Sequence, residues 1–143
     1  MSIAELAPAY IRAISPYQPG KPITQLAREM GIPVDKIVKL ASNENPLGMS
    51  PRARAAMQAA IDGIERYPDQ FDLTAALSER FGVGMEQIVL GNGSNDVLDL
   101  VARVFLAPGR SSVFSRHAFA VYPLATMSAG GECIVVPAKH YGH

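Results

Sequence analysis

Short apolar runs alternate along this chain with longer segments in which apolar residues recur every three or four positions. The runs are typical of buried strands, and the longer segments are typical of amphipathic helices. We expect strands near residues 37–41, 88–90, 112–115 and 132–136. We expect helices at residues 23–30, 51–64, 73–81, from the Ser94-Asn95 pair to about residue 105, and within 117–128.

Proline, glycine and capping residues indicate where these helices begin and end. Pro22 is placed to begin one helix, and Gly31 is placed to end it. Ser50 is expected to cap the next helix, and Asp72 to cap the helix at 73–81. An earlier segment that contains Pro8 is only weakly helical, so the chain is expected to open with an extended arm.

Strands separated by helices of about ten residues or more indicate βαβ units and a parallel sheet. The pattern stops at residue 143 after about three such strands. We therefore expect an α/β protein with an incomplete parallel sheet and flanking helices, forming the front part of a longer polypeptide.

The stretch Leu90–Val104 joins a strand to a helix through two closely spaced glycines, Gly91 and Gly93. The first N–H groups of a helix have no intrahelical partner, and its dipole favours an anion by about 0.3–1 kcal/mol. Glycines also let an oxyanion approach the backbone, so this turn predicts a phosphate site. Alternatively, the glycines only permit a tight turn, and Ser94 or Asn95 caps the helix.

Composition narrows the choice of partners. The 13 basic residues balance the 13 acidic ones, so no strong field attracts nucleic acid. No apolar run is long enough for a signal segment or a membrane span, so we expect a cytoplasmic protein.

Cys133 lies in an apolar run and is expected to be a buried strand residue. His117, His140 and His143 show no metal-ligand spacing, so no metal site is expected.

Motifs that cover almost the whole chain resemble one enzyme family. In order they are Tyr17-x-Pro19-Gly20-Lys21-Pro22, Lys39-Leu40-Ala41-Ser42-Asn43-Glu44-Asn45-Pro46-Leu47-Gly48, Tyr67-Pro68-Asp69, Leu90-Gly91-Asn92-Gly93-Ser94-Asn95 and Phe119-Ala120-Val121-Tyr122. This series is similar to the N-terminal part of histidinol-phosphate aminotransferases, which are pyridoxal 5'-phosphate (PLP) enzymes of fold type I.

The resemblance implies a fold and a division of the chain. The expected fold is an N-terminal arm followed by the first βαβαβ portion of the large domain of a fold type I transferase. Residues 1–49 would form the arm and a loop segment with a small-domain strand. Residues 50–143 would form the front part of the PLP-binding large domain.

The resemblance also implies PLP as the cofactor and assigns residues to it. The backbone N–H groups of Asn92, Gly93 and Ser94 would hold the PLP phosphate. Phe119 would stack on the pyridine ring of the cofactor. Tyr67 would reach the PLP phosphate of the partner subunit, so the full-length protein is expected to be a homodimer.

On the substrate side, the resemblance places Tyr17 over the phosphate end of a small-molecule substrate and Asn45 beside that substrate. The implied reaction converts L-histidinol phosphate and 2-oxoglutarate to imidazole-acetol phosphate and glutamate, in histidine biosynthesis. The family's catalytic lysine would lie beyond residue 143, so no catalytic residue is assigned here, and the segment alone is expected to be inactive. The alternatives are another fold type I aminotransferase, a PLP decarboxylase, or a non-catalytic phosphate-binding module.

Overall fold

The computed structural model describes residues 3–140 and 142, and it divides the chain into two compact units. Unit 1 consists of Met1–Tyr17 and Leu77–His143, and unit 2 consists of Gln18–Ala76. The predicted arm and all of the predicted large-domain strands therefore belong to unit 1.

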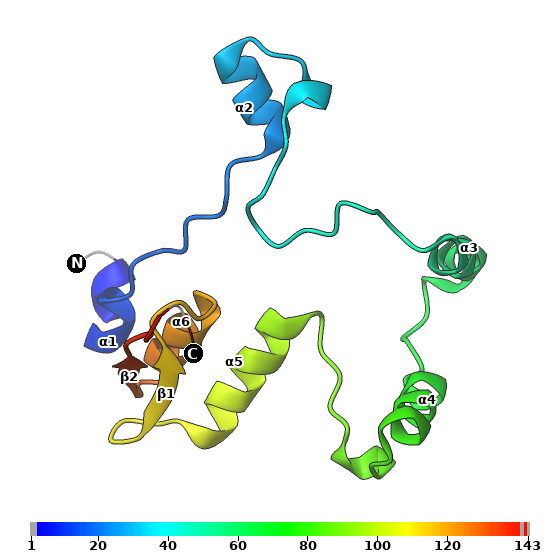
Figure 1. Ribbon diagram of the computed structural model, residues 1–143. Coiled ribbons are helices and arrows are strands. Elements are labelled where there is room, and N and C mark those ends of the chain that lie inside the picture. Colours follow the sequence, from blue (N-terminus) through cyan, green and yellow to red (C-terminus); the bar gives the residue numbers. More distant parts are fainter. Residues whose placement is uncertain (1–2, 141, 143) are drawn as a thin grey trace. The chain divides into compact units, whose positions relative to one another are not determined.

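Short helices dominate the chain (Figure 1). In order, with η for a 3-10 helix, the elements are η1 (Ile3–Leu6), α1 (Ala9–Arg12), α2 (Ile23–Met30), η2 (Val34–Lys36), α3 (Pro51–Ala60), η3 (Ile61–Gly63), α4 (Phe71–Phe81), η4 (Met85–Gln87), α5 (Ser94–Phe105), β1 (Ser111–Ser115), α6 (Val121–Ser128) and β2 (Glu132–Val136). None of the helices in the described residues has the length and apolarity needed to span a membrane.

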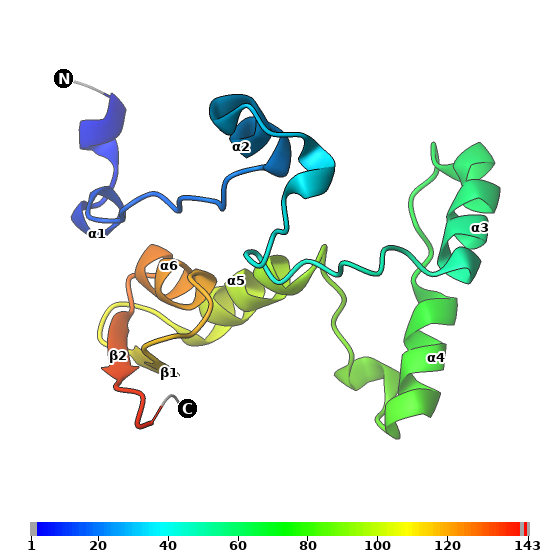
Figure 2. The ribbon, with the colours of Figure 1, turned by 45° about the horizontal axis from the view of Figure 1, so that its top comes forward.

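A βαβ unit forms the centre of unit 1. Strands β1 and β2 pair in parallel, with Val113 opposite Ile134, and α6 connects them. Figures 1 and 2 show α6 packed beside the two strands, and α1 of the arm contacts α6. The strands expected at 112–115 and 132–136, and their parallel pairing, are confirmed.

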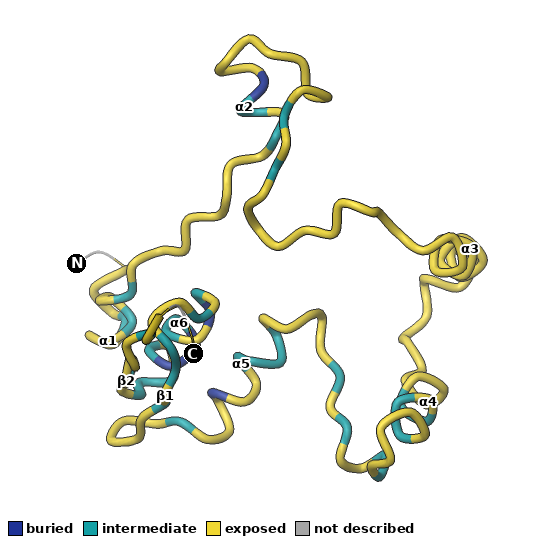
Figure 3. The backbone as a smooth tube through the Cα atoms, in the orientation of Figure 1, coloured by how far each residue is buried: buried dark blue, intermediate teal, exposed yellow. Residues whose placement is uncertain are grey.

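Small side chains let α5 and α6 approach each other. Ala102 on α5 packs with Val121 and Ala125 on α6, and each of the three is at most 7% exposed. These positions contribute to the dark segments of α5 and α6 in Figure 3. Burial of this cluster holds the helix that follows the predicted phosphate turn against the βαβ unit.

A buried threonine joins α6 to β1. The Thr126 side chain is only 3% exposed, and its hydroxyl donates to the carbonyl oxygen of Tyr122 at 2.7 Å. The Ser112 hydroxyl on β1 lies 2.7 Å from the same Thr126 oxygen. Because the Thr126 proton is used toward Tyr122, Ser112 is the donor of this second bond.

In unit 2, α2 has the bounds that its sequence predicts. It runs from Ile23 to Met30 and follows Pro22, and Gly31 ends it with a left-handed φ of 66°. The Lys21 ammonium lies 2.5 Å from the Glu29 carboxylate, across the length of the helix. Hydrogen bonds from Lys21, and then from Gln25, lower the pKa of Glu29 below its ordinary value of 4.5.

We expect the Lys21–Glu29 pair to stabilise α2 only in its ionised form. A carboxyl whose pKa is lowered by folding contributes stability above its unfolded pKa and loses it as the pH falls through the folded pKa. The contribution should therefore be present above pH 4.5 and be lost progressively as the pH falls below 4.5 and through the lower pKa of the folded protein. An NMR titration of the Glu29 carboxyl should give a midpoint under 4.5, and Lys21→Met should raise that midpoint. An unchanged midpoint in Lys21→Met would contradict this account.

The N-termini of the next two helices lack the side-chain caps that were predicted. Ser50 precedes α3 as predicted, but its side chain makes no capping hydrogen bond. The prediction that Asp72 caps the following helix is wrong, since α4 begins at Phe71 and the Phe71 N–H donates to Asp69 Oδ1 at 2.9 Å. Asp72 lies in the first turn of α4, where the helix dipole stabilises its negative charge.

Two predicted strands are absent from the described residues. Segments 37–41 and 88–90 have no strand assignment, and within them Leu40 is 91% exposed and Val89 is 71% exposed. The sheet therefore has two strands rather than three. A strand exists only where another strand supplies hydrogen-bond partners, and neither segment has such a partner in the part of the chain described here.

Candidate functional site

The predicted phosphate turn leads directly into α5. Gly93 occupies the N-cap position with φ 91° and ψ 173°, a backbone conformation that essentially only glycine adopts. No side chain caps this helix, so the alternative in which Ser94 or Asn95 caps it is wrong. The first turn of α5 therefore offers backbone donors rather than a side-chain cap.

The N–H groups of the turn are used in different ways. The Asn92 N–H donates to Asp96 Oδ2 at 3.0 Å, and the Gly93 N–H donates to the Gly91 carbonyl oxygen at 2.9 Å. Within residues 3–140 and 142, the N–H groups of Ser94 and Asn95 have no hydrogen-bond partner. The Ser94 and Asn95 donors therefore remain available at the N-terminal end of α5, and the Asn92 donor is held by a carboxylate.

One hollow in unit 1 brings three of the predicted segments together. A hollow of about 250 Å³ is lined by Ile14, Asn95 and Val121, among other residues. Ile14 lies three positions before Tyr17, Asn95 directly follows Ser94, and Val121 lies two positions after Phe119. The hollow therefore lies between the arm, the first turn of α5 and α6, and Tyr17, Ser94 and Phe119 themselves do not line it.

Phe119 lies beyond the carboxyl end of β1. It lines a groove of about 450 Å³ together with Val113, Phe114, Ser115, His117, Ala118 and Tyr122. The Phe119 side chain is 47% exposed, so one part of its ring is accessible. Ligands of parallel α/β sheets bind outside the carboxyl ends of the strands, and the groove has that position.

The remaining predicted site residues are exposed or engaged locally. Tyr17 ends the first segment of unit 1 and is 54% exposed. Tyr67 belongs to unit 2 and is fully exposed. Asn45, also in unit 2, accepts from the Leu47 N–H and donates to the Gly48 carbonyl oxygen, each at 3.0 Å. Its side chain thereby fixes the shape of its own loop.

Asp96 is the residue of this region that the sequence reasoning missed. The sequence shows it only as an acidic residue where a dinucleotide-binding fingerprint needs a small one. The sequence signal that could have found it is the spacing of four residues between Asn92 and Asp96. A side chain in the first turn of a helix can accept a hydrogen bond from a backbone N–H just before that helix.

Cys133 lies in β2 as expected, but it is half-buried rather than buried. Burial raises the pKa of the Cys133 thiol, a hydrogen bond with Thr126 lowers it, and the charge of Glu132 raises it. In the described part of the chain no three His, Cys, Asp or Glu side chains are grouped to hold a metal ion. His143 lies outside the described residues.

We expect Cys133 to react slowly with iodoacetamide at neutral pH, because the thiolate is the nucleophile and the raised pKa keeps the thiol protonated. The rate should reach half its maximum above pH 9.0, the ordinary value for the group. Glu132→Gln should lower this midpoint, because the carboxylate raises the pKa of the thiol. A midpoint at or below pH 9.0 in the unaltered protein would contradict the assigned effect of burial.

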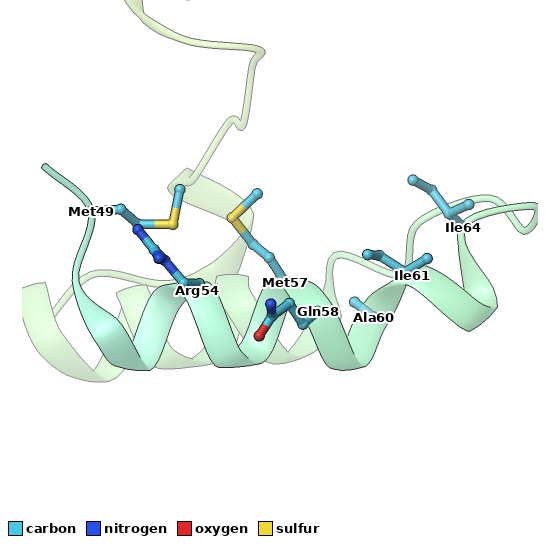
Figure 4. Close-up of a pocket in the computed structure, with 7 residues that line it drawn as sticks. All are labelled: Met49, Arg54, Met57, Gln58, Ala60, Ile61 and Ile64. Carbon is cyan, nitrogen blue, oxygen red and sulfur yellow. The ribbon is translucent and has the colours of Figure 1, made fainter.

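Unit 2 contains an apolar hollow. It has a volume of about 430 Å³ along one side of α3 and η3 (Figure 4). Its lining residues are Met49, Arg54, Met57, Gln58, Ala60, Ile61 and Ile64. None of the residues assigned to cofactor or substrate lines it.

Comparison with known proteins identifies the family. The profile of the family described as "Aminotransferase class I and II" matches residues 35–142 of the chain. The chain belongs to the class I and II aminotransferases. The match includes the phosphate turn, Asn45, Tyr67 and Phe119, while Tyr17 lies before it.

Curated relatives of this aminotransferase segment are similar to it along its whole length. It is 78% identical over 143 residues to histidinol-phosphate aminotransferase 1 of Dechloromonas aromatica (strain RCB), covering 100% of the chain and 40% of the relative. It is 68% identical over 145 residues to histidinol-phosphate aminotransferase 2 of Nitrosospira multiformis, covering 100% of the chain and 37% of the relative. The chain thus spans about 40% of the length of these relatives, and the resemblance found in its motifs is confirmed.

A solved structure shows the same fold. It is the crystal structure of histidinol-phosphate aminotransferase from Sinorhizobium meliloti in complex with pyridoxal-5'-phosphate. The TM-score is 0.74 at 23% sequence identity, over 94% of this aminotransferase segment and 36% of the solved chain. The fold class, the first portion of a fold type I transferase with an incomplete parallel sheet, is therefore confirmed.

Proposed function

We propose that this chain is the N-terminal segment of a PLP-dependent aminotransferase that acts on L-histidinol phosphate and 2-oxoglutarate. The products would be imidazole-acetol phosphate and glutamate, so the protein would serve histidine biosynthesis in the cytoplasm. One observation carries the proposal: in a member of this family, Ile14 of the arm, Asn95 in the first turn of α5 and Val121 at the start of α6 line one hollow, and each lies close in sequence to a predicted site residue.

Free backbone donors at the start of α5 support the assignment of the turn to the PLP phosphate. The N–H groups of Ser94 and Asn95 have no partner in the described residues, and the N-terminus of α5 favours a negative charge. Gly93 has no side chain to cover the turn. Nothing else lies within 4 Å of where its Cβ would be, so the space beside the turn is open. In the proposal, Asn92, Gly93 and Ser94 hold the phosphate oxygens with their backbone N–H groups.

Other residues would orient the cofactor and substrate. The accessible Phe119 ring would stack on the flat pyridine ring and exclude water from that face. PLP, when bound, supplies an electron sink that makes the Cα–H bond of an attached amine acidic. Tyr17 would cover the phosphate end of the substrate, and Asn45, whose side chain makes two hydrogen bonds within its own loop, would lie beside the substrate.

The quaternary structure and the domain division are parts of the same proposal. The Tyr67 side chain is fully exposed, so it is free to reach the PLP phosphate of a second subunit in a homodimer. Residues 1–49 would be the arm and loop segment, and residues 50–143 the front part of the cofactor-binding domain. The lysine that moves the substrate proton would come from the additional length that the relatives have.

The test uses the full open reading frame that carries this segment. With PLP, L-histidinol phosphate and 2-oxoglutarate, the purified protein should form glutamate only when both substrates are present. Turnover of a different amine with no turnover of histidinol phosphate would favour another aminotransferase. Release of carbon dioxide from an amino acid would favour a decarboxylase, and binding of PLP without any turnover would favour a binding module.

A further inference from the structure

We propose that Asp96 competes with the PLP phosphate for the Asn92 amide and so sets the affinity of the turn for phosphate. This inference rests on the proposed function, because it concerns the regulation of the same site. Asp96 would hold the turn in its binding conformation while it is empty, and its carboxylate would have to leave when phosphate arrives.

The first observation is the hydrogen bond that closes the turn. Asp96 lies in the first turn of α5, and its Oδ2 accepts the Asn92 N–H at 3.0 Å. Asn92 is one of the three residues whose amides are assigned to the phosphate. The carboxylate therefore accepts an N–H that the proposed function assigns to a phosphate oxygen, and it carries the same sign of charge.

A second observation shows that the approach of Asp96 depends on Gly91. A Cβ atom on Gly91 would lie 3.0 Å from Asp96 Oδ2 and 2.9 Å from Val97 Cγ2. Both distances are shorter than ordinary contacts, so a side chain at this position would displace the carboxylate or the helix. The glycine thus leaves room for Asp96 beside the turn as well as for a ligand.

Electrostatics gives this arrangement two opposite effects. The carboxylate is favourable in the first turn of α5, because the N-terminal end of a helix dipole is positive. A bound phosphate is a dianion, and Asp96 would repel it across a short distance at a half-buried position. Asp96 therefore orders the empty turn and weakens the phosphate complex.

The decisive variant is Asp96→Asn, which removes the charge and keeps an oxygen that accepts the Asn92 N–H. We expect the apoenzyme of the full-length variant to bind PLP about tenfold more tightly than the unaltered apoenzyme, a gain of about 1.4 kcal/mol. Pyridoxal, which lacks the phosphate, should bind both proteins equally. The measured quantity is the ratio of the dissociation constants for PLP and pyridoxal. A general loss of structure would weaken the binding of both ligands and would not change this ratio in favour of PLP.

Two further variants complete the experiment. Asp72→Asn removes the same charge from the first turn of a different helix, α4, and should leave both affinities unchanged. Asp96→Ser provides a second neutral residue in case the asparagine variant does not fold, and it should shift the PLP affinity in the same direction. Isothermal titration calorimetry of each apoenzyme with PLP and with pyridoxal gives the two dissociation constants that the comparison needs for each protein.

The outcomes separate the two proposals. Tighter binding of PLP alone in the Asp96 variants supports the inference. Equal or weaker binding of PLP in these variants, with PLP bound by the unaltered protein, overturns the role of Asp96 and leaves the proposed function standing. Failure of the unaltered protein to bind PLP overturns both.

Discussion

Replacing Gly93 with alanine should weaken binding of PLP to the full-length protein by about tenfold or more, a loss of at least about 1.4 kcal/mol. Gly93 has φ 91° and ψ 173°, and forcing another residue into such a conformation costs about 1–3 kcal/mol. The backbone would relax away from this conformation, and the Ser94 N–H would then no longer point at the phosphate. Calorimetric titration of the apoenzyme with PLP measures the effect.

Gly109 provides a matched control for this variant. It has φ 87°, it lies in the loop between α5 and β1, and a Cβ there would meet nothing within 4 Å, as at Gly93. Gly109→Ala should therefore lower the free energy of unfolding by a similar amount and leave the PLP affinity unchanged. Equal PLP affinities in the two variants would show that the conformation of Gly93 does not position the phosphate donors.

Replacing Thr126 with valine should lower the free energy of unfolding by about 1–3 kcal/mol. The side chain is 3% exposed, and its oxygen joins the Tyr122 carbonyl to the Ser112 hydroxyl. Valine keeps the shape of threonine but leaves the half-buried Ser112 hydroxyl without its acceptor. Urea denaturation of the full-length protein, followed by circular dichroism, measures the change.

Two controls identify the source of this effect. Ser112→Ala combined with Thr126→Val removes both partners, and it should recover much of the lost stability. Thr74→Val removes an equivalent bond, 2.8 Å from the threonine hydroxyl to the Gln70 carbonyl oxygen four residues earlier, at a position of α4 that is half-buried rather than buried. A loss in Thr74→Val as large as that in Thr126→Val would show that the bond from α6 to β1 has no special importance.

Elements whose limits depend on local chemistry were predictable from the sequence. The bounds of α2 follow from Pro22 and Gly31, because proline precedes helices easily and glycine adopts the left-handed conformation that ends them. Strand β2 was also predicted with its observed bounds, since an apolar run between glycines and a proline leaves little choice. The glycine turn before α5 was also predicted, because closely spaced glycines between a short apolar run and a helical pattern indicate a tight turn.

Features that depend on more distant partners were not predictable. Segments 37–41 and 88–90 have the composition of strands, but pattern alone does not show whether another strand lies beside them. The bond between Asp96 and the Asn92 amide depends on where the first turn of α5 directs a carboxylate. The hollow that joins Ile14 to Asn95 and Val121 requires residues far apart in sequence to meet.

The two-stranded sheet has a consequence for synthesis of the protein. In the described residues β1 and β2 pair only with each other, and Val113 and Ile134 remain 65% and 44% exposed. If the polypeptide continues to the length of its relatives, this segment leaves the ribosome about 10 to 40 s before translation ends, at about 5–20 residues per second. During that interval its open strand edges are targets for ribosome-associated chaperones, which should bind nascent chains halted soon after residue 143.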